Sequence, residues 1–188
     1  EVKTMVYWEY MLDLKEKTYE IAKQLGMEDY WDWSIYQPCP LWTPCDAHKI
    51  DKDEYPLYAF SWADTFHSNS NNHELRWIDE VSQMNPYSYF ININESTAKK
   101  MVLKTGDRVK VQTNTGYEVE GYLKTRQGIH PDCVAMMGVS GHWAKGLPVA
   151  KNKGVNFNTL IDFSIKNMDP LTATVDILVK VKISKIDD

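Results

Sequence analysis

Residues 91–113 read ININESTAKKMVLKTGDRVKVQT and decide the fold, because two predicted strands are joined there by a short helix and a Gly-Asp turn. Asn94 is a good N-cap for the helix, since its side chain can accept from the first free amides. Gly106 can adopt a positive φ, and the carboxylate of Asp107 can cap neighbouring amides. Residues 108–113 then alternate between polar and apolar, as a strand with one buried face does. The pattern predicts a sharp return from helix to strand.

The sequence on both sides of this unit is rich in short predicted strands. They cover residues 55–62, 89–93, 108–113, 117–125, 133–137 and 175–186. Asn114-Thr115-Gly116 is a tight-turn sequence, so 108–113 and 117–125 are expected to pair as antiparallel neighbours. Short strands with a single helix among them favour a small barrel over a sandwich or a doubly wound sheet. The Gly-Asp turn resembles that of double-psi β-barrels, so the fold class is predicted as mainly β with short helices, a double-psi β-barrel.

The first 54 residues differ in character and are predicted to be a helix and linker arm, followed by a barrel domain over 55–188. Apolar residues recur at three-to-four spacing over 5–25, which predicts an amphipathic helix, and Gly26 ends it. Residues 30–44 are dense in proline and tryptophan, which excludes helix and central strand. We expect this arm to be extended and to leave aromatic surface for sequence outside the chain.

Composition limits the class of protein. The chain has 188 residues, with 43% hydrophobic and 25% charged residues, as in an ordinary globular domain rather than a disordered one. Its net charge of −5 argues against a duplex nucleic-acid partner, and no apolar run is long enough for a membrane helix. The first residue is Glu1 rather than Met, so we expect a processed product or a piece of a larger protein.

Cysteine usage gives little support for a metal site. Cys39, Cys45 and Cys133 are irregularly spaced, and only His48 lies near the first two. A C-x-x-C pair is absent from the sequence, so reduced thiols are favoured over a metal cluster. Asp64 and His67 could form an acid–base pair, but two such residues three apart in a polar loop are common. No catalytic residue and no metal ligand is therefore predicted in this chain.

Three segments in fixed order carry the functional signal. The first is SWADTFHSNSNN at 61–72, the second is the strand–helix–Gly-Asp–strand unit at 91–111, and the third runs from GHWA at 141–144 to NFNTL at 156–160. DPLT at 169–172 follows, before the last strand. In this order they resemble the C-terminal, molybdopterin-dinucleotide-binding domain of the dimethyl sulfoxide reductase family of molybdenum and tungsten oxidoreductases. The resemblance covers residues 55–186.

The resemblance implies a domain that closes over molybdopterin guanine dinucleotide, which carries Mo or W in the full-length enzyme. It implies cofactor contacts from the polar and aromatic residues of two loops, 61–72 and 141–160, which should lie side by side on one face. These residues are Trp62, Thr65, His67, Ser68, Ser70, Asn71, His142, Trp143, Asn156 and Asn158. Neutral side chains and backbone amides suit a large polar cofactor, since they bind it without a large charge penalty.

The resemblance also implies partners and an activity. The preceding domains of the same catalytic subunit would complete the enzyme, an iron–sulfur electron-transfer subunit is a further partner, and the isolated chain should be inactive. The GHWA segment is similar to that of reductases of sulfur or arsenic oxyanions, which serve anaerobic respiration. Many family members act outside the cytoplasmic membrane, which favours that location. The alternative is a free-standing double-psi barrel that acts as a binding module without a redox cofactor. Such a barrel needs the Gly-Asp turn but has no use for the third segment.

Overall fold

The computed structural model describes residues 10–39, 41–67, 69–169 and 171–186. The chain divides into two compact units, one made of Glu1–Asp46 with Phe163–Asp176 and the other of Ala47–Asp162 with Ile177–Asp188. Residues 163–176 thus pack with the N-terminal arm, whereas the expected boundary after residue 54 left them with the barrel. The division into functional domains stays a prediction.

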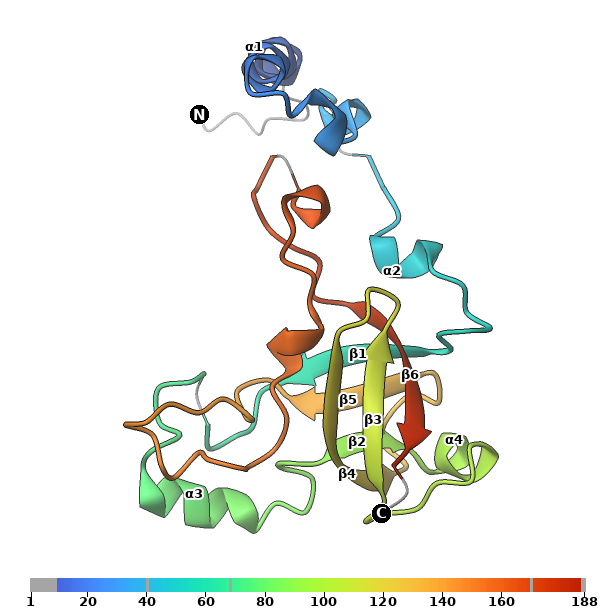
Figure 1. Cartoon of the computed structure of the whole chain (residues 1–188), viewed down its shortest axis with the longest axis vertical. Helices are drawn as coiled ribbons and strands as arrows, with labels where there is room; N and C mark the ends of the chain where they lie inside the picture. The colour runs from blue at the N-terminus through green and yellow to red at the C-terminus, as the bar shows by residue number, and fades with distance from the viewer. Residues whose placement is uncertain (1–9, 40, 68, 170, 187–188) are drawn as a thin grey trace, which may run out of the picture. The chain divides into compact units, whose positions relative to one another are not determined.

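The second unit is a closed six-stranded barrel with double-psi topology (Figure 1). Its strands follow the order β1-β5-β2-β4-β3-β6. Their bounds are β1 Leu57–Trp62, β2 Ile91–Asn94, β3 Arg108–Thr113, β4 Glu118–Arg126, β5 Cys133–Met137 and β6 Val179–Lys185. β1 pairs with β5 and β2 with β4 in parallel, and the other neighbours are antiparallel. The barrel predicted from the sequence is confirmed, including the antiparallel pair of β3 and β4.

The unit that decides the fold forms as its sequence predicts. Asn94 caps helix α4, Glu95–Lys100, by accepting a hydrogen bond from the amide of Ser96 at 2.8 Å. Gly106 has a φ of +93° and donates its amide to the carbonyl of Leu123 at 2.9 Å. Asp107 accepts from the amide of Lys104 at 2.9 Å. The Gly-Asp turn therefore fixes the start of β3 against β4.

The barrel core comes from alternate positions of the strands. Buried side chains that fill it include Leu57, Ala59, Ile91, Ile93, Val109, Val111, Leu123, Val134, Met136, Val181 and Ile183. Alternation puts these groups on one face of each strand and leaves polar residues on the other. The last strand begins at Val179, four residues later than predicted, because 163–176 belong to the first unit.

The first unit contains helix α1, Tyr10–Gln24, and the chain leaves it through Gly26, which has the expected positive φ of +65°. Two short 3-10 helices, η1 Glu28–Tyr30 and η2 Trp33–Ile35, interrupt the arm that was predicted to be extended. Trp33 packs edge-on against Tyr19 and stacks on Tyr36. Trp31 donates from Nε1 to the carbonyl of Ile165 at 3.2 Å. The arm thus buries part of its aromatic surface within its own unit.

The remaining helices are short. They are α2 Asp46–Lys49, α3 Arg76–Gln83, η3 Phe157–Leu160 and η4 Ile165–Asn167. Within the described part of the chain, no helix combines the length and the apolar character needed to span a bilayer.

Candidate functional site

Loops 61–74 and 141–160 meet on the side of the barrel that carries α3, as Figure 1 shows. The amide of Gly138, just after β5, donates to the carbonyl of Trp62 at the end of β1, 2.9 Å away. Further out, the rings of His67 and His73 stack with their centroids 4.2 Å apart. His142, from the other loop, stands edge-on to His73 at 5.0 Å. Segments almost seventy residues apart in sequence therefore form one surface, although the direct contact is made by His73, one residue past the predicted loop 61–72.

Two structural features hold loop 141–160 in place. The carboxylate of Glu74 accepts from the amides of Val149 and Ala150 at 2.9 and 2.8 Å. Gly141 has a φ of +75°. It lies so close to the backbone of residues 155–156, later in the same loop, that an added Cβ would be 2.1 Å from the amide nitrogen of Asn156. Only glycine fits such an approach. Loop 141–160 therefore has a defined conformation that these contacts hold in place.

His67 lies at the centre of a polar network and is fully buried. Its Nδ1 is 3.2 Å from Oδ1 of Asn72, and its Nε2 is 3.1 Å from the hydroxyl of Tyr89. That hydroxyl donates to Oδ1 of Asp79 at 3.0 Å, and Lys153 donates to Oδ2. The network links the first loop to α3 and to the second loop.

Asp79 and Tyr89 keep their ordinary charge states. Burial would raise the pKa of Asp79, but hydrogen bonds from Lys153 and Tyr89 outweigh it and lower that pKa. Burial, the hydrogen bond to Asp79 and the Asp79 charge all raise the pKa of Tyr89. At neutral pH a carboxylate therefore accepts from an un-ionised phenol.

Asp64 is a structural residue. It is 4% exposed, and its carboxylate accepts from the hydroxyl of Ser88 at 2.5 Å, from Asn85 at 3.1 Å and from the amide of Phe66 at 2.9 Å. Burial would raise its pKa, but these hydrogen bonds dominate and lower it. They hold the turn that begins loop 61–74.

The site residues predicted from the sequence have different surroundings. Trp62, His142 and Asn156 are half-buried, and His67 is buried. Thr65, Ser70, Asn71, Trp143 and Asn158 are exposed, and Ser68 lies outside the described residues. Asn156 accepts from the amide of Asn158 at 3.2 Å and so caps η3. Nζ of Lys151 lies 4.6 Å from the ring centroid of Trp143.

Two buried donors or acceptors in these loops have no hydrogen-bond partner within the described residues: Nε1 of Trp62 and Nε2 of His73. A buried polar atom left unpaired costs free energy, so such atoms indicate a place where a polar ligand completes the hydrogen bonding. Burial and the charges of His67 and His142 lower the pKa of His73 to about 4, so its ring is neutral. The residues present therefore fit a large polar cofactor at this surface.

Sequence reasoning missed several residues of this site. His73 was left out because the polar loop was read as ending at residue 72, although a second histidine six residues after His67 was a usable signal. Asp79, Tyr89 and Lys153 gave no signal, since each is an ordinary residue of a helix, a strand end or a loop. Their roles depend on contacts between distant segments.

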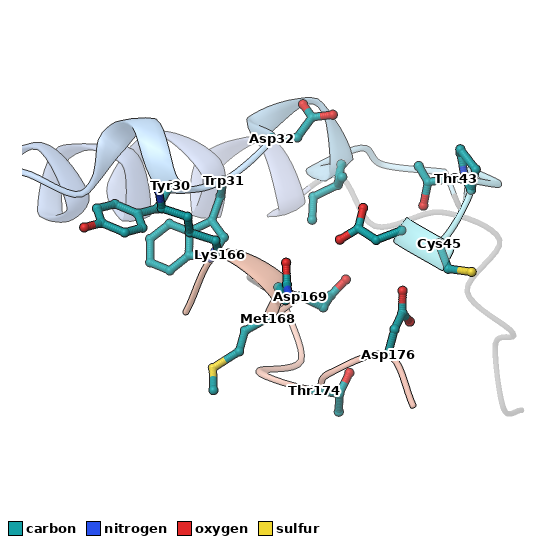
Figure 2. Close-up of a pocket in the computed structure, with 14 residues that line it drawn as sticks. Tyr30, Trp31, Asp32, Thr43, Cys45, Lys166, Met168, Asp169, Thr174 and Asp176 are labelled. Carbon is teal, nitrogen blue, oxygen red and sulfur yellow. The ribbon is translucent and has the colours of Figure 1, made fainter. Parts of the chain in front are cut away.

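The first unit has a separate pocket of about 280 Å³, shown in Figure 2. Asp32, Asp169, Asp176 and Lys166 line it, with Cys45 at one side. The carboxylates of Asp32 and Asp169 accept from backbone amides of their own turns, at 2.9 Å in each case. No group of three or more His, Cys, Asp or Glu suited to a metal ion occurs among the residues that the structure describes. We therefore assign no ligand to this pocket.

Comparison with known proteins identifies the family. Residues 57–176 match the model of the molydopterin dinucleotide binding domain, and since this is more than half of the chain, the chain belongs to that family. The resemblance drawn from the three sequence segments is thereby confirmed. Proteins of this family bind molybdopterin dinucleotide, the cofactor expected from the sequence.

Individual relatives are more distant. The chain is 26% identical over 145 residues to the arsenate respiratory reductase molybdopterin-containing subunit ArrA of Chrysiogenes arsenatis, covering 72% of this chain and 17% of that subunit. It superposes on acetylene hydratase from Pelobacter acetylenicus with a TM-score of 0.63 and 18% identity, covering 88% of this chain and 22% of that one. The second match concerns the fold alone. The chain thus spans about a fifth of the length of either protein.

Proposed function

We propose that this chain is the cofactor-closing C-terminal domain of a molybdenum or tungsten oxidoreductase that holds two molybdopterin guanine dinucleotides. The observation that supports it best is the pair of unpartnered buried atoms, Nε1 of Trp62 and Nε2 of His73, at the surface where the two loops meet. A barrel without a ligand there would leave both atoms unpaired at a cost of about 1–3 kcal/mol each.

In this proposal the loops bind and orient the cofactor and keep water from it. Trp62 and His73 supply buried contacts, and the exposed side chains of Thr65, Ser70, Asn71 and Asn158 supply polar contacts at the rim. His142 and Trp143 line one side of the cofactor site. The half-buried Asn156 accepts from the amide of Asn158 and so fixes the turn on which Asn158 lies. The cofactor itself would supply the dithiolene ligands of the metal. The metal's protein ligand and the catalytic residues lie outside this chain, so the isolated chain is inactive.

The substrate class proposed is an oxyanion of sulfur or arsenic. The relationship to an arsenate respiratory reductase subunit supports arsenic, and the GHWA segment at 141–144 supports the same group of reductases. Electrons would come through an iron–sulfur subunit.

The proposed partner surface lies on the preceding domains of the same catalytic subunit. Helix α3 supports this, since Trp77 and Val81 of the helix and its C-cap residue Met84 form an exposed stripe of apolar side chains next to the loops of the site. Exposed apolar groups that form one stripe on a helix favour packing against another protein surface.

A direct test measures the cofactor content of the enzyme that contains this chain. Replacing His73→Phe keeps a flat ring against His67 but removes both ring nitrogens. Asn158→Ala removes an exposed amide from the rim. We expect both variants to retain less molybdenum or tungsten and less guanine nucleotide than the wild type, by about tenfold for a lost hydrogen bond of about 1.4 kcal/mol.

His48→Phe, at an exposed position on α2, is the matched control and should retain full occupancy. Full occupancy in both loop variants would remove the basis for the cofactor assignment and would favour the alternative, a barrel that acts as a binding module without a redox cofactor.

A further inference from the structure

The side chain of Glu74 binds two successive backbone amides of loop 141–160. Its Oε2 accepts from the amide of Val149 at 2.9 Å, and its Oε1 accepts from the amide of Ala150 at 2.8 Å. Among the residues that the structure describes, neither amide donates to a backbone carbonyl, and Pro148 before them has no N–H to donate. Successive amides that converge on one point make a concave site for an anion. Glu74 therefore fills an anion site that the backbone of the loop forms.

The base of the same loop is closed by bonds that do not involve Glu74. The amide of Gly141 donates to the carbonyl of Lys153 at 2.8 Å, and Oγ of Ser140 donates to the carbonyl of Val155 at 3.2 Å. These bonds join the two ends of the segment 142–152 to each other. Glu74 holds this segment from outside it, because residues 149–150 lie between the two ends.

Two residues predicted to contact the cofactor lie on this segment. Nζ of Lys151 lies 4.6 Å from the ring centroid of Trp143. The ring of His142 lies edge-on to that of His73, with 5.0 Å between their centroids. Glu74 directly follows His73 in the sequence, and the backbone that it binds directly precedes Lys151. The contact made by Glu74 therefore fixes the backbone next to both ring contacts.

We propose that Glu74 is a positioning residue for the cofactor, whose carboxylate holds segment 142–152 so that His142 and Trp143 face the cofactor. The hold on the segment follows from this chain alone, and its link to the cofactor rests on the proposed function. Both oxygens are needed, because each accepts from a different amide. A glutamine keeps the shape of the side chain but offers one acceptor oxygen, and its NH₂ group would face an amide N–H.

The first experiment measures amide exchange and NMR spectra of the 188-residue chain. In Glu74→Gln, at least one of the amides of Val149 and Ala150 should exchange with solvent about tenfold faster, as expected for a lost hydrogen bond to a charged group. The indole N–H resonance of Trp143, which is assigned by its absence from Trp143→Phe, should shift in the same variant.

Amides of β3 report on the fold of the barrel and should keep their wild-type exchange rates. Glu80→Gln, at an exposed position on α3, is the matched control and should change neither the loop amides nor the indole resonance. Wild-type exchange at residues 149 and 150 in Glu74→Gln would overturn the proposal.

The second experiment returns the missing group as a small molecule. Glu74→Ala removes a fragment of the size of acetate, so added acetate should slow the exchange of the amides at 149 and 150 and restore the indole resonance of Trp143. Acetamide has the same shape with one acceptor oxygen fewer, and its effect should be smaller. Equal recovery with both compounds, or recovery with neither, would contradict the role of the carboxylate.

In the enzyme that contains this chain, Glu74→Gln should retain less guanine nucleotide than the wild type. Loss of nucleotide in Asn158→Ala but not in Glu74→Gln would overturn this inference and leave the proposed function standing. Full nucleotide content in both His73→Phe and Asn158→Ala would instead overturn the proposed function, even where Glu74→Gln loosens the loop in the chain alone.

Discussion

At His73, burial and the charges of the two neighbouring histidines all lower the pKa of the ring. The ring is 4% exposed and lies between His67 and His142, and its pKa falls to about 4. An unfolded chain would bind this proton at an ordinary pKa of about 6.5. Between these two values the unfolded state carries more protons than the folded state, so acid favours unfolding there.

We therefore predict that part of the pH dependence of stability comes from His73. Between pH 6.5 and pH 5, protonation of the unfolded state at this residue should lower the free energy of unfolding by about 1.6 kcal/mol. Urea unfolding at both pH values checks this, and His73→Phe should lose that part of the decrease. His130→Phe, at an exposed position, should keep it. Equal decreases in His73→Phe and the wild type would contradict the prediction.

At the scale of the element, α3 is the clearest departure from simple patterning. Helices of globular proteins bury their apolar face, yet in α3 the buried residues are Asp79 and Ser82, while Trp77 within it and Met84 directly after it are each 82% exposed. Asp79 is drawn inward by Lys153 and Tyr89. The hydrogen-bond network beneath the site determines which face of the helix is buried.

The end of α4 gives a prediction at the same scale. Leu103 donates its amide to the carbonyl of Ala98 at 2.8 Å and Val102 to that of Lys99 at 3.3 Å, which is the Schellman pattern. Val102 occupies the left-handed position of this motif, with a φ of +58°, and is 87% exposed. Glycine is favoured there because a β-branched residue is strained at positive φ.

Val102→Gly should raise the free energy of unfolding by about 1 kcal/mol, since it relieves the strain and loses little packing. Urea unfolding measures the change. Val102→Ala, which keeps a Cβ, should gain less than Val102→Gly. A loss of stability in the glycine variant would show that the Val102 side chain makes a contribution larger than the strain.

At the scale of the molecule, the two units have separate sources of stability. The barrel has a closed set of strands and its own apolar core, while the first unit relies on aromatic contacts among Tyr19, Trp31, Trp33 and Tyr36 and on the segment 163–176. Closure of a barrel removes the unpaired edges that would otherwise need cover. The barrel should therefore not depend on the arm for its fold.

We predict that deleting residues 1–46 leaves the barrel folded. The loss in the free energy of unfolding should stay below about 4 kcal/mol, a small part of an ordinary domain's total. Amides of 163–176 should exchange faster, because their packing surface is removed. Thermal unfolding and hydrogen exchange check both statements. A barrel that fails to fold without the arm would show that the arm is integral.

The elements of the barrel could be predicted because their signals are local. Alternation marks β3 and β4, Asn94 marks the start of α4, and Gly106 with Asp107 marks the return to β3. That loop 61–72 should approach loop 141–160 could be expected only through the resemblance to a family in which both reach one cofactor, and the contacts themselves come from His73 and Glu74, just past that loop. The division at 163–176 could not, since its packing depends on contacts with residues more than a hundred positions away.

By itself the sequence determined the barrel, the Gly-Asp turn that shapes it and the family to which the chain belongs, because turn geometry and strand alternation are imposed by neighbouring residues. Only the tertiary structure decided which polar groups of the site are satisfied. Asn72, Tyr89 and Asp79 come together around His67, and His73 is left with an unpaired nitrogen, through contacts between a loop, a strand end and a helix. Burial and hydrogen-bond complementarity are properties of the packed chain, and no pattern of adjacent residues specifies them.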